Sequence, residues 1–210
     1  MIKNIIFDFG GVMLPLCRET CINNFSKIGV DDFGKYLLNN TPDGFFAAFE
    51  NGDITEDDFR NKIRSLSKFN QVPDSLIDTA LYSFLGKVES STTSAIERLI
   101  NVYNLYIVSN NNPITWPICL NLYNTVSTKS LEKTFNGIYL SYQMKCSKPS
   151  AEYFNKLMYM SNIVASETLY IDDNYENIES AKTLGFKTFL FDTNQNFAMQ
   201  LSEAIIKNNG

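Results

Sequence analysis

Apolar residues in this chain gather in short continuous runs, separated by longer segments with helical periodicity. Continuous runs are typical of strands buried on both faces of a sheet, because a half-exposed strand alternates apolar and polar residues. Five runs have the length and flanking residues of a strand, and they span residues 5–7, 105–108, 137–140, 168–171 and 187–191. The pattern therefore predicts five strands.

The segments between these runs predict helices over residues 95–102, 151–160 and 177–184. The last of these stops at Gly185, a residue type that often follows the C-terminal end of a helix. Strands that alternate with helices and end in polar residues are typical of a doubly wound α/β fold with a parallel sheet. Ligands of such sheets bind beyond the carboxyl ends of the strands.

Residues 15–90 interrupt the alternation, because they have helical patterns and no convincing strand. Thr55 and Asp58 have the spacing of a capping box, which would begin a helix with Phe59 and Ile63 facing inward. Two further apolar stripes have helical spacing, one of Phe45, Phe46 and Phe49 and the other of Leu76, Ile77, Ala80, Leu81 and Phe84. We therefore predict a helical subdomain over residues 15–90, inserted into an α/β core of residues 1–14 and 91–210.

The composition argues against two classes of binding partner, nucleic acids and membranes. The formal net charge is −5 and there is no run of Lys and Arg, so we expect no nucleic-acid partner. No apolar stretch approaches the ~20 residues that span a bilayer, so we expect no membrane partner. The four cysteines form neither a C-x-x-C motif nor a disulfide framework, which predicts buried or half-buried thiols in a cytoplasmic protein. The oligomeric state stays open.

The chain contains no histidine. This absence excludes a Ser-His-Asp triad, a Cys-His dyad and a zinc site with histidine ligands. Catalysis would therefore depend on carboxylates, lysine, hydroxyl groups, cysteine, tyrosine or a metal ion bound through oxygen.

Four polar motifs lie where the predicted sheet would bind a ligand. They are Asp8-Phe9-Gly10-Gly11, Ser109-Asn110-Asn111, Ser147-Lys148-Pro149, and Asp172-Asp173-Asn174 followed by Asn177. Each motif alone is common in turns and helix caps, but their order and their placement at strand ends make the set specific.

The set resembles the four motifs of the haloacid dehalogenase superfamily over nearly the whole chain, and the insertion resembles the helical cap of one large subfamily. Residues 49–55, 138–141 and 172–178 are similar to the branch that includes bacterial α-D-glucose-1-phosphate phosphatase. The resemblance implies a Rossmann-like core with an inserted cap. It also implies Mg²⁺-dependent hydrolysis of a small phosphorylated metabolite, most simply a sugar phosphate.

The resemblance assigns roles to the motif residues. Asp8 would attack phosphorus and form an aspartyl-phosphate, which divides one difficult displacement into two easier ones. A phosphate dianion repels a carboxylate, so the site needs positive charge, and Mg²⁺ prefers oxygen ligands. The implied metal ligands are Asp8, the Gly10 carbonyl and Asp173, with Asp172 behind them or bound through water.

The remaining roles concern the phosphate group. Lys148 would neutralise the negative charge of the phosphate and the nucleophile. The Ser109 hydroxyl and the Asn110 backbone amide would donate to phosphate oxygens. Asn177 would tie the last loop together through hydrogen bonds, and Lys145 would add positive charge near the site.

Gly10 departs from the family pattern. Most phosphatases of the superfamily have an aspartate there, which acts as general acid and base, and such catalysis contributes roughly 10²–10⁴-fold in rate. Two explanations stay open: an anomeric phosphate has a less basic leaving group and needs less protonation, or a cap carboxylate replaces the aspartate. The candidate carboxylates are Glu50, Asp53 and Asp43. An alternative is a catalytically weak family member that serves as a binding or regulatory protein.

Overall fold

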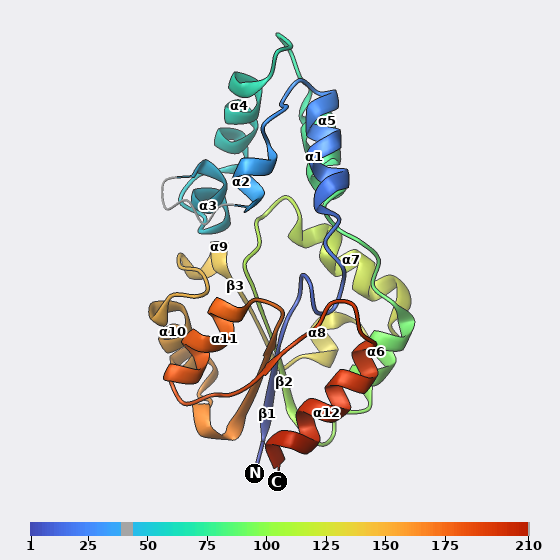
Figure 1. Ribbon diagram of the computed structural model, residues 1–210, viewed down its shortest axis with the longest axis vertical. Coiled ribbons are helices and arrows are strands. Elements are labelled where there is room, and N and C mark those ends of the chain that lie inside the picture. The colour runs from blue at the N-terminus through green and yellow to red at the C-terminus, as the bar shows by residue number, and fades with distance from the viewer. Residues whose placement is uncertain (39–43, 210) are drawn as a thin grey trace.

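A computed structural model of the chain describes residues 1–38 and 44–209. A central sheet lies between two layers of helices, and a separate group of helices lies beyond the carboxyl ends of the strands (Figure 1). The two ends of the described chain meet at the opposite end of the molecule, where the Ile2 amide donates to Asn209 Oδ1 at 2.9 Å.

The sheet confirms the five predicted strands and the doubly wound class. Its strands are β1 (Asn4–Asp8), β2 (Asn104–Ser109), β3 (Gly137–Leu140), β4 (Thr168–Asp172) and β5 (Lys187–Leu190). All neighbours pair in parallel, in the order β3-β2-β1-β4-β5. The carboxyl ends of β1, β2 and β4 are therefore adjacent, and three of the four polar motifs follow these strands.

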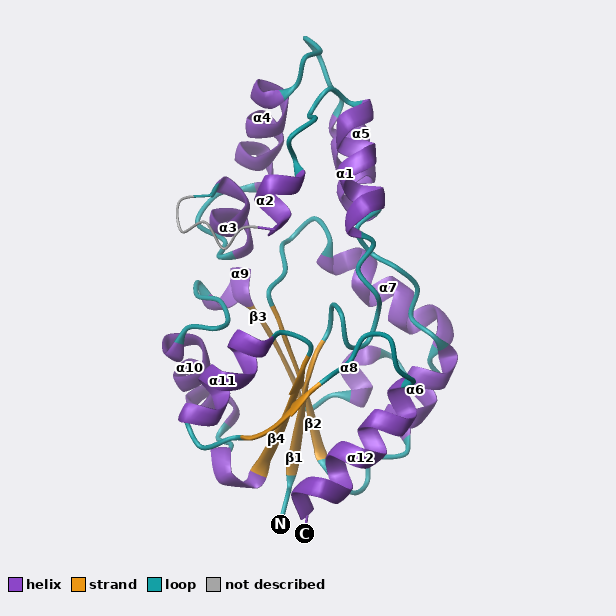
Figure 2. Cartoon of the chain, viewed as in Figure 1, coloured by secondary structure: helices purple, strands orange, loops and turns teal. Residues whose placement is uncertain are grey.

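The side chains of the inner strands alternate between two hydrophobic cores, as the geometry of a strand requires. Ile5 and Phe7 enter one core, while Ile6 between them enters the other. The first face is covered by α6 (Ser90–Glu97), α7 (Trp116–Val126), α8 (Leu131–Thr134) and α12 (Phe197–Asn209). The other is covered by α9 (Ser141–Met144), α10 (Ala151–Ser161) and α11 (Tyr175–Thr183), and the short 3₁₀ helix η1 (Ala165–Glu167) leads into β4. Figure 2 shows the strands between these two helical layers.

The described residues of the inserted segment form the helices α1 (Arg18–Lys27), α2 (Gly34–Leu38), α3 (Phe45–Glu50), α4 (Glu56–Leu66) and α5 (Asp74–Tyr82). With Ile114 from the loop after β2, they form a second hydrophobic core, in which the rings of Phe49 and Phe59 stack with centroids 4.4 Å apart. The predicted capping box is present, since Thr55 Oγ1 accepts from the Asp58 amide at 3.1 Å and Asp58 Oδ2 accepts from the Thr55 amide at 3.0 Å. The boundaries at residues 15 and 90 stay a prediction.

Two chain segments connect the inserted helices, which we call the cap, to the sheet. The Cys17 amide donates to the Phe84 carbonyl at 2.7 Å, and the Gly86 amide donates to the Pro15 carbonyl at 2.8 Å. The two connections therefore run side by side and are hydrogen-bonded to each other.

Helix α6 differs from the prediction of a helix over 95–102. It begins at Ser90, ends at Glu97 and is followed by turns. Its first half contains buried threonines rather than apolar residues, and Thr93 Oγ1 donates to the Ser90 and Val126 carbonyls at 3.1 and 3.3 Å. Because the Thr93 hydroxyl has backbone acceptors, it can be buried, and apolar periodicity does not mark the start of the helix.

The predicted stripe on α5 was wrong at Leu76, which is 50% exposed. The buried residues are Ile77, Ala80 and Leu81. Their spacing defines one helical face, and Leu76 lies about 100° away from Ile77 around the helix axis.

The predicted burial of the cysteines is confirmed. Cys21, Cys119 and Cys146 are buried, Cys17 is half-buried, and all four are free thiols. Across residues 1–38 and 44–209, no helix has the length and apolar character needed to cross a membrane.

The aromatic core of the cap generates a stability prediction. Phe59 is fully buried, so Phe59→Ala should lower the free energy of unfolding by about 3–5 kcal/mol, because it removes the ring contacts and leaves a cavity. Phe69→Ala is the matched control, since Phe69 is 56% exposed and its loss should cost less than about 1 kcal/mol. Urea unfolding followed by circular dichroism measures both, and equal losses would contradict the packing described here.

Candidate active site

Asp8 ends the central strand β1 and lies at the bottom of a cavity. The chain turns away immediately after it, and Gly11 has a φ of +86°, a conformation that favours glycine. A Cβ atom on Gly11 would also overlap the Asp173 carboxylate. The second glycine of the motif therefore allows the loop after β1 to approach the loop after β4 closely.

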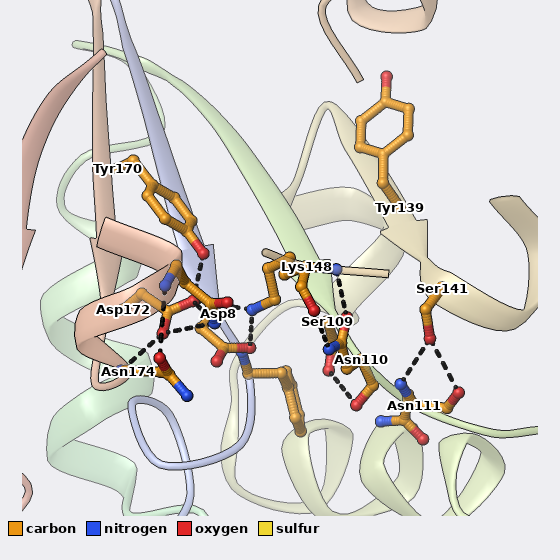
Figure 3. Close-up of polar contacts among 12 residues, drawn as sticks. Asp8, Ser109, Asn110, Asn111, Tyr139, Ser141, Lys148, Tyr170, Asp172 and Asn174 are labelled. Atoms are coloured by element: carbon orange, nitrogen blue, oxygen red, sulfur yellow. Dashed lines mark hydrogen bonds and ion pairs between the residues drawn. The ribbon is translucent and has the colours of Figure 1, made fainter. Parts of the chain in front are cut away.

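Lys148 lies between two carboxylates at the centre of the site (Figure 3). Its Nζ is 2.9 Å from Asp8 Oδ1 and 2.8 Å from Asp172 Oδ2, and its side chain is buried. Burial lowers the pKa of Lys148, but the charges of Asp172 and Asp8 outweigh that effect and raise the pKa above its usual range. The ammonium group therefore stays charged at neutral pH.

Asp172 is fully buried, and donors surround both of its carboxylate oxygens. The Tyr170 hydroxyl and Lys148 Nζ donate to Oδ2, the Asn174 amide donates to Oδ1 at 2.8 Å, and Asn177 Nδ2 contacts both oxygens at 3.0 and 3.1 Å. The role predicted for Asn177 in tying this loop together is visible in these bonds. Because its oxygens are occupied, Asp172 is suited to hold Lys148, and it lies behind the cavity wall rather than on it.

Three carboxylates and one ammonium group leave an excess of negative charge. One oxygen each of Asp8, Asp172 and Asp173 lies within 4.8 Å of the others. Burial raises the pKa of Asp8 well above its usual range; Lys148 opposes this, whereas Asp172 and Asp173 add to it. Burial and Asp172 also raise the pKa of Asp173. A hard divalent cation with oxygen ligands fits this site, and Asp8 and Asp173 are the cavity-lining carboxylates that would hold Mg²⁺. The Gly10 carbonyl as a further ligand stays a prediction.

The loop after β2 positions Lys148. Asn110 Nδ2 donates to the Lys148 carbonyl at 2.9 Å, and the Lys148 amide donates to Asn110 Oδ1 at 3.0 Å. Ser109 ends β2, is buried, and lines the cavity beside Asn110. The sequence predicted a phosphate-binding role for Asn110 through its backbone, and it did not predict this reciprocal bond from its side chain.

The residues predicted to bind the metal or the phosphate all line one cavity of about 600 Å³ between the sheet and the cap, except Asp172. The cap contributes Glu50, which is half-buried, and Arg18 from the start of α1. Of the other candidate carboxylates, Asp53 is exposed and Asp43 lies outside the described residues. The structure therefore distinguishes Glu50 from Asp53, which the sequence could not do.

Lys145 was predicted to add positive charge near the site, but it does not line this cavity. Its Nζ donates to the Gly52 carbonyl of the cap.

Two residues that contact the site or line its cavity, Tyr170 and Arg18, were not predicted from the sequence. Tyr170 precedes Asp172 by two residues in β4, so the two side chains share a face of the strand, and this spacing was an available signal. No local pattern indicated that Arg18 would reach the cavity.

Comparisons with known proteins show which family the chain resembles in sequence and fold. Residues 74–191 match the sequence model of the haloacid dehalogenase-like hydrolases. The chain is 33% identical over 189 residues to D-ribitol-5-phosphate phosphatase of Bacteroides thetaiotaomicron, and the match covers 90% of this chain and 91% of that protein.

Two solved structures are similar along almost their full length. A haloacid dehalogenase family enzyme from Bacteroides thetaiotaomicron, in complex with magnesium and inorganic phosphate, has 34% identity and a TM-score of 0.88, covering 95% of this chain and 98% of that one. A Porphyromonas gingivalis protein described as a hydrolase of this type has 31% identity and a TM-score of 0.89, covering 98% of both chains.

The carboxylate cluster generates a metal-binding prediction. Mg²⁺ should raise the melting temperature, because binding to the folded state alone adds about 2.7 kcal/mol at a hundredfold excess over Kd. Asp173→Asn should lose most of the increase, and Asp53→Asn, an exposed cap carboxylate, should keep it. Differential scanning fluorimetry with and without EDTA measures the shift, and an unchanged shift in Asp173→Asn would exclude the site.

The buried lysine generates a stability prediction. Lys148→Met should destabilise the metal-free protein by about 3–5 kcal/mol, because it leaves Asp172 and Asp8 buried without their counter-charge. Lys3→Met removes the exposed pair with Glu167 and should cost less than about 1 kcal/mol. Urea unfolding in EDTA compares the two variants, and a Lys148→Met protein as stable as Lys3→Met would refute this assignment.

Proposed function

The chain belongs to the haloacid dehalogenase-like hydrolases, and from this membership and the site geometry we propose that it is a Mg²⁺-dependent phosphatase acting on a small phosphorylated sugar or polyol. The observation that carries the proposal is the contact of Lys148 Nζ with Asp8 at 2.9 Å, in a cavity also lined by Ser109 and Asp173. A carboxylate can approach an anion only where positive charge lies beside it.

In the proposed mechanism, an Asp8 oxygen attacks phosphorus and the bond between phosphorus and the leaving oxygen breaks. Lys148 holds the nucleophile in place and offsets charge on the phosphoryl oxygens, and the Ser109 hydroxyl donates to one of them. Bound Mg²⁺ would supply Lewis-acid stabilisation of the phosphate charge. Water then attacks the aspartyl-phosphate and releases inorganic phosphate.

The size of the cavity and the curated relative support the substrate class. A cavity of about 600 Å³ accommodates a monosaccharide or polyol phosphate and is small for a polymer. The relative from Bacteroides thetaiotaomicron is named for D-ribitol 5-phosphate. Among the residues that the structure describes, Arg18 is the cavity-lining cation on the cap side, where the polar body of such a substrate would lie.

A binding or regulatory protein is the weaker alternative. The feature in its favour is Gly10, which has no acidic side chain. The nucleophile, the lysine and the acidic pair are nevertheless all present, and a binding protein has no need for a lysine held against a buried carboxylate. We therefore favour an active hydrolase.

The nucleophile generates the central test. Asp8→Asn should lower the kcat/KM for p-nitrophenyl phosphate in Mg²⁺ by about 10³-fold or more, because the amide oxygen is a far weaker nucleophile. Removing Mg²⁺ with EDTA should abolish the wild-type activity. Release of p-nitrophenol measures both effects, and activity that survives Asp8→Asn would reject the mechanism.

A substrate panel then tests the proposed class. It should include D-ribitol 5-phosphate, pentose and hexose phosphates, and α-D-glucose 1-phosphate as the anomeric phosphate. Phosphate release from one of these well above the rate with p-nitrophenyl phosphate would support a sugar or polyol substrate.

A further inference from the structure

The cavity contains a third carboxyl group that the mechanism above does not use. Among the described residues that line it, the carboxylates are Asp8 and Asp173 from the sheet side and Glu50 from the cap side. Glu50 is the last residue of α3, which lies above β3 and α9 (Figure 1). The cap therefore places one acidic side chain over the site.

Residues of the α/β core hold the C-terminal end of α3 in place. Ser141 Oγ at the start of α9 donates to the Glu50 carbonyl at 2.5 Å, and Lys145 Nζ donates to the Gly52 carbonyl. Gly52 has a φ of +71°, and a Cβ there would overlap the Tyr142 carbonyl. These contacts set the position of Glu50 relative to the sheet.

The surroundings of Glu50 suit proton transfer. Burial raises the pKa of Glu50 to about 7, against the opposing charges of Lys148 and Arg18. At neutral pH the carboxyl group is therefore divided between protonated and ionised forms, as a group that both donates and accepts a proton should be.

The direction of the displacement requires a proton donor on the cap side. In phosphoryl transfer the attacking and leaving oxygens are roughly in line with phosphorus, so an attack from Asp8 expels the leaving oxygen away from the sheet. Gly10 offers no side chain, and the Leu16 side chain lies 3.1 Å from the place that its Cβ would take. The cap side is where Glu50 lines the cavity.

We propose that Glu50 is the general acid and base of the reaction, an inference that rests on the proposed phosphatase function. As the bond from phosphorus to the leaving oxygen breaks, the carboxyl proton of Glu50 moves to that oxygen and an alcohol departs. The resulting carboxylate then takes a proton from the water that attacks the aspartyl-phosphate. Phosphate leaves, Asp8 is regenerated, and Glu50 is protonated again.

The test compares two leaving groups. A primary alkoxide, as in D-ribitol 5-phosphate, must be protonated as it departs, whereas p-nitrophenolate is stable as an anion. Glu50→Gln keeps the shape and cannot donate the proton, so its kcat should fall about 10²–10⁴-fold with D-ribitol 5-phosphate and by a much smaller factor with p-nitrophenyl phosphate. A folding defect would lower both rates equally, so the ratio of the two losses is the readout.

Asp53→Asn is the matched control, because Asp53 is an exposed carboxylate three residues further along the same cap segment. Asp53→Asn should leave the ratio of the two rates, with D-ribitol 5-phosphate and with p-nitrophenyl phosphate, unchanged from the wild type. Equal losses with both substrates in Glu50→Gln, or no loss with either, would overturn the proposal. A wild-type protein that hydrolyses p-nitrophenyl phosphate but no alkyl phosphate would also overturn the proposal for Glu50. Activity that survives in Asp8→Asn would instead refute the phosphatase mechanism as a whole.

Discussion

The site depends on one buried ammonium group, that of Lys148, held between Asp8 and Asp172 at 2.9 and 2.8 Å. Burying an isolated charge is costly, and it is tolerated only where close counter-charges and hydrogen bonds replace water. Burial alone would lower the pKa of Lys148, and the neighbouring charges of Asp172 and Asp8 raise it instead. The loops that supply these three residues must therefore fold together.

The hydrogen bonds give Asp172 and Asp8 different roles. Tyr170, Asn174 and Asn177 occupy Asp172, which fixes its orientation and leaves it to anchor the lysine. Asp8 lies on the open side, where it faces the cavity and the cap. The cavity is thus bounded by the strand ends on one side and by residues of α3, Glu50 among them, on the other.

Much of the fold could be predicted from the sequence, because burial on both faces of a parallel sheet imposes continuous apolar runs. All five strands and the helices α10 and α11 were predicted close to their observed limits, and the start of α4 was predicted from its capping box. Helices α6, α7 and α12 were misplaced or missed. The buried faces of α6 and α12 include polar residues such as Thr93 and Gln200, which also form hydrogen bonds outside their own helices, so the apolar periodicity of these two helices is weak.

By itself, then, the sequence determined the sheet, the inserted helices and the motif residues at the strand ends, because local spacing and burial pattern specify these. Only the tertiary structure decided that Asp172 holds Lys148 and that Glu50, rather than Asp53, faces the cavity. That distinction depends on a contact between Ser141 and Glu50, which are 91 residues apart in the chain. No local pattern contains such information, because the direction of a side chain on a short helix is set by what the helix packs against.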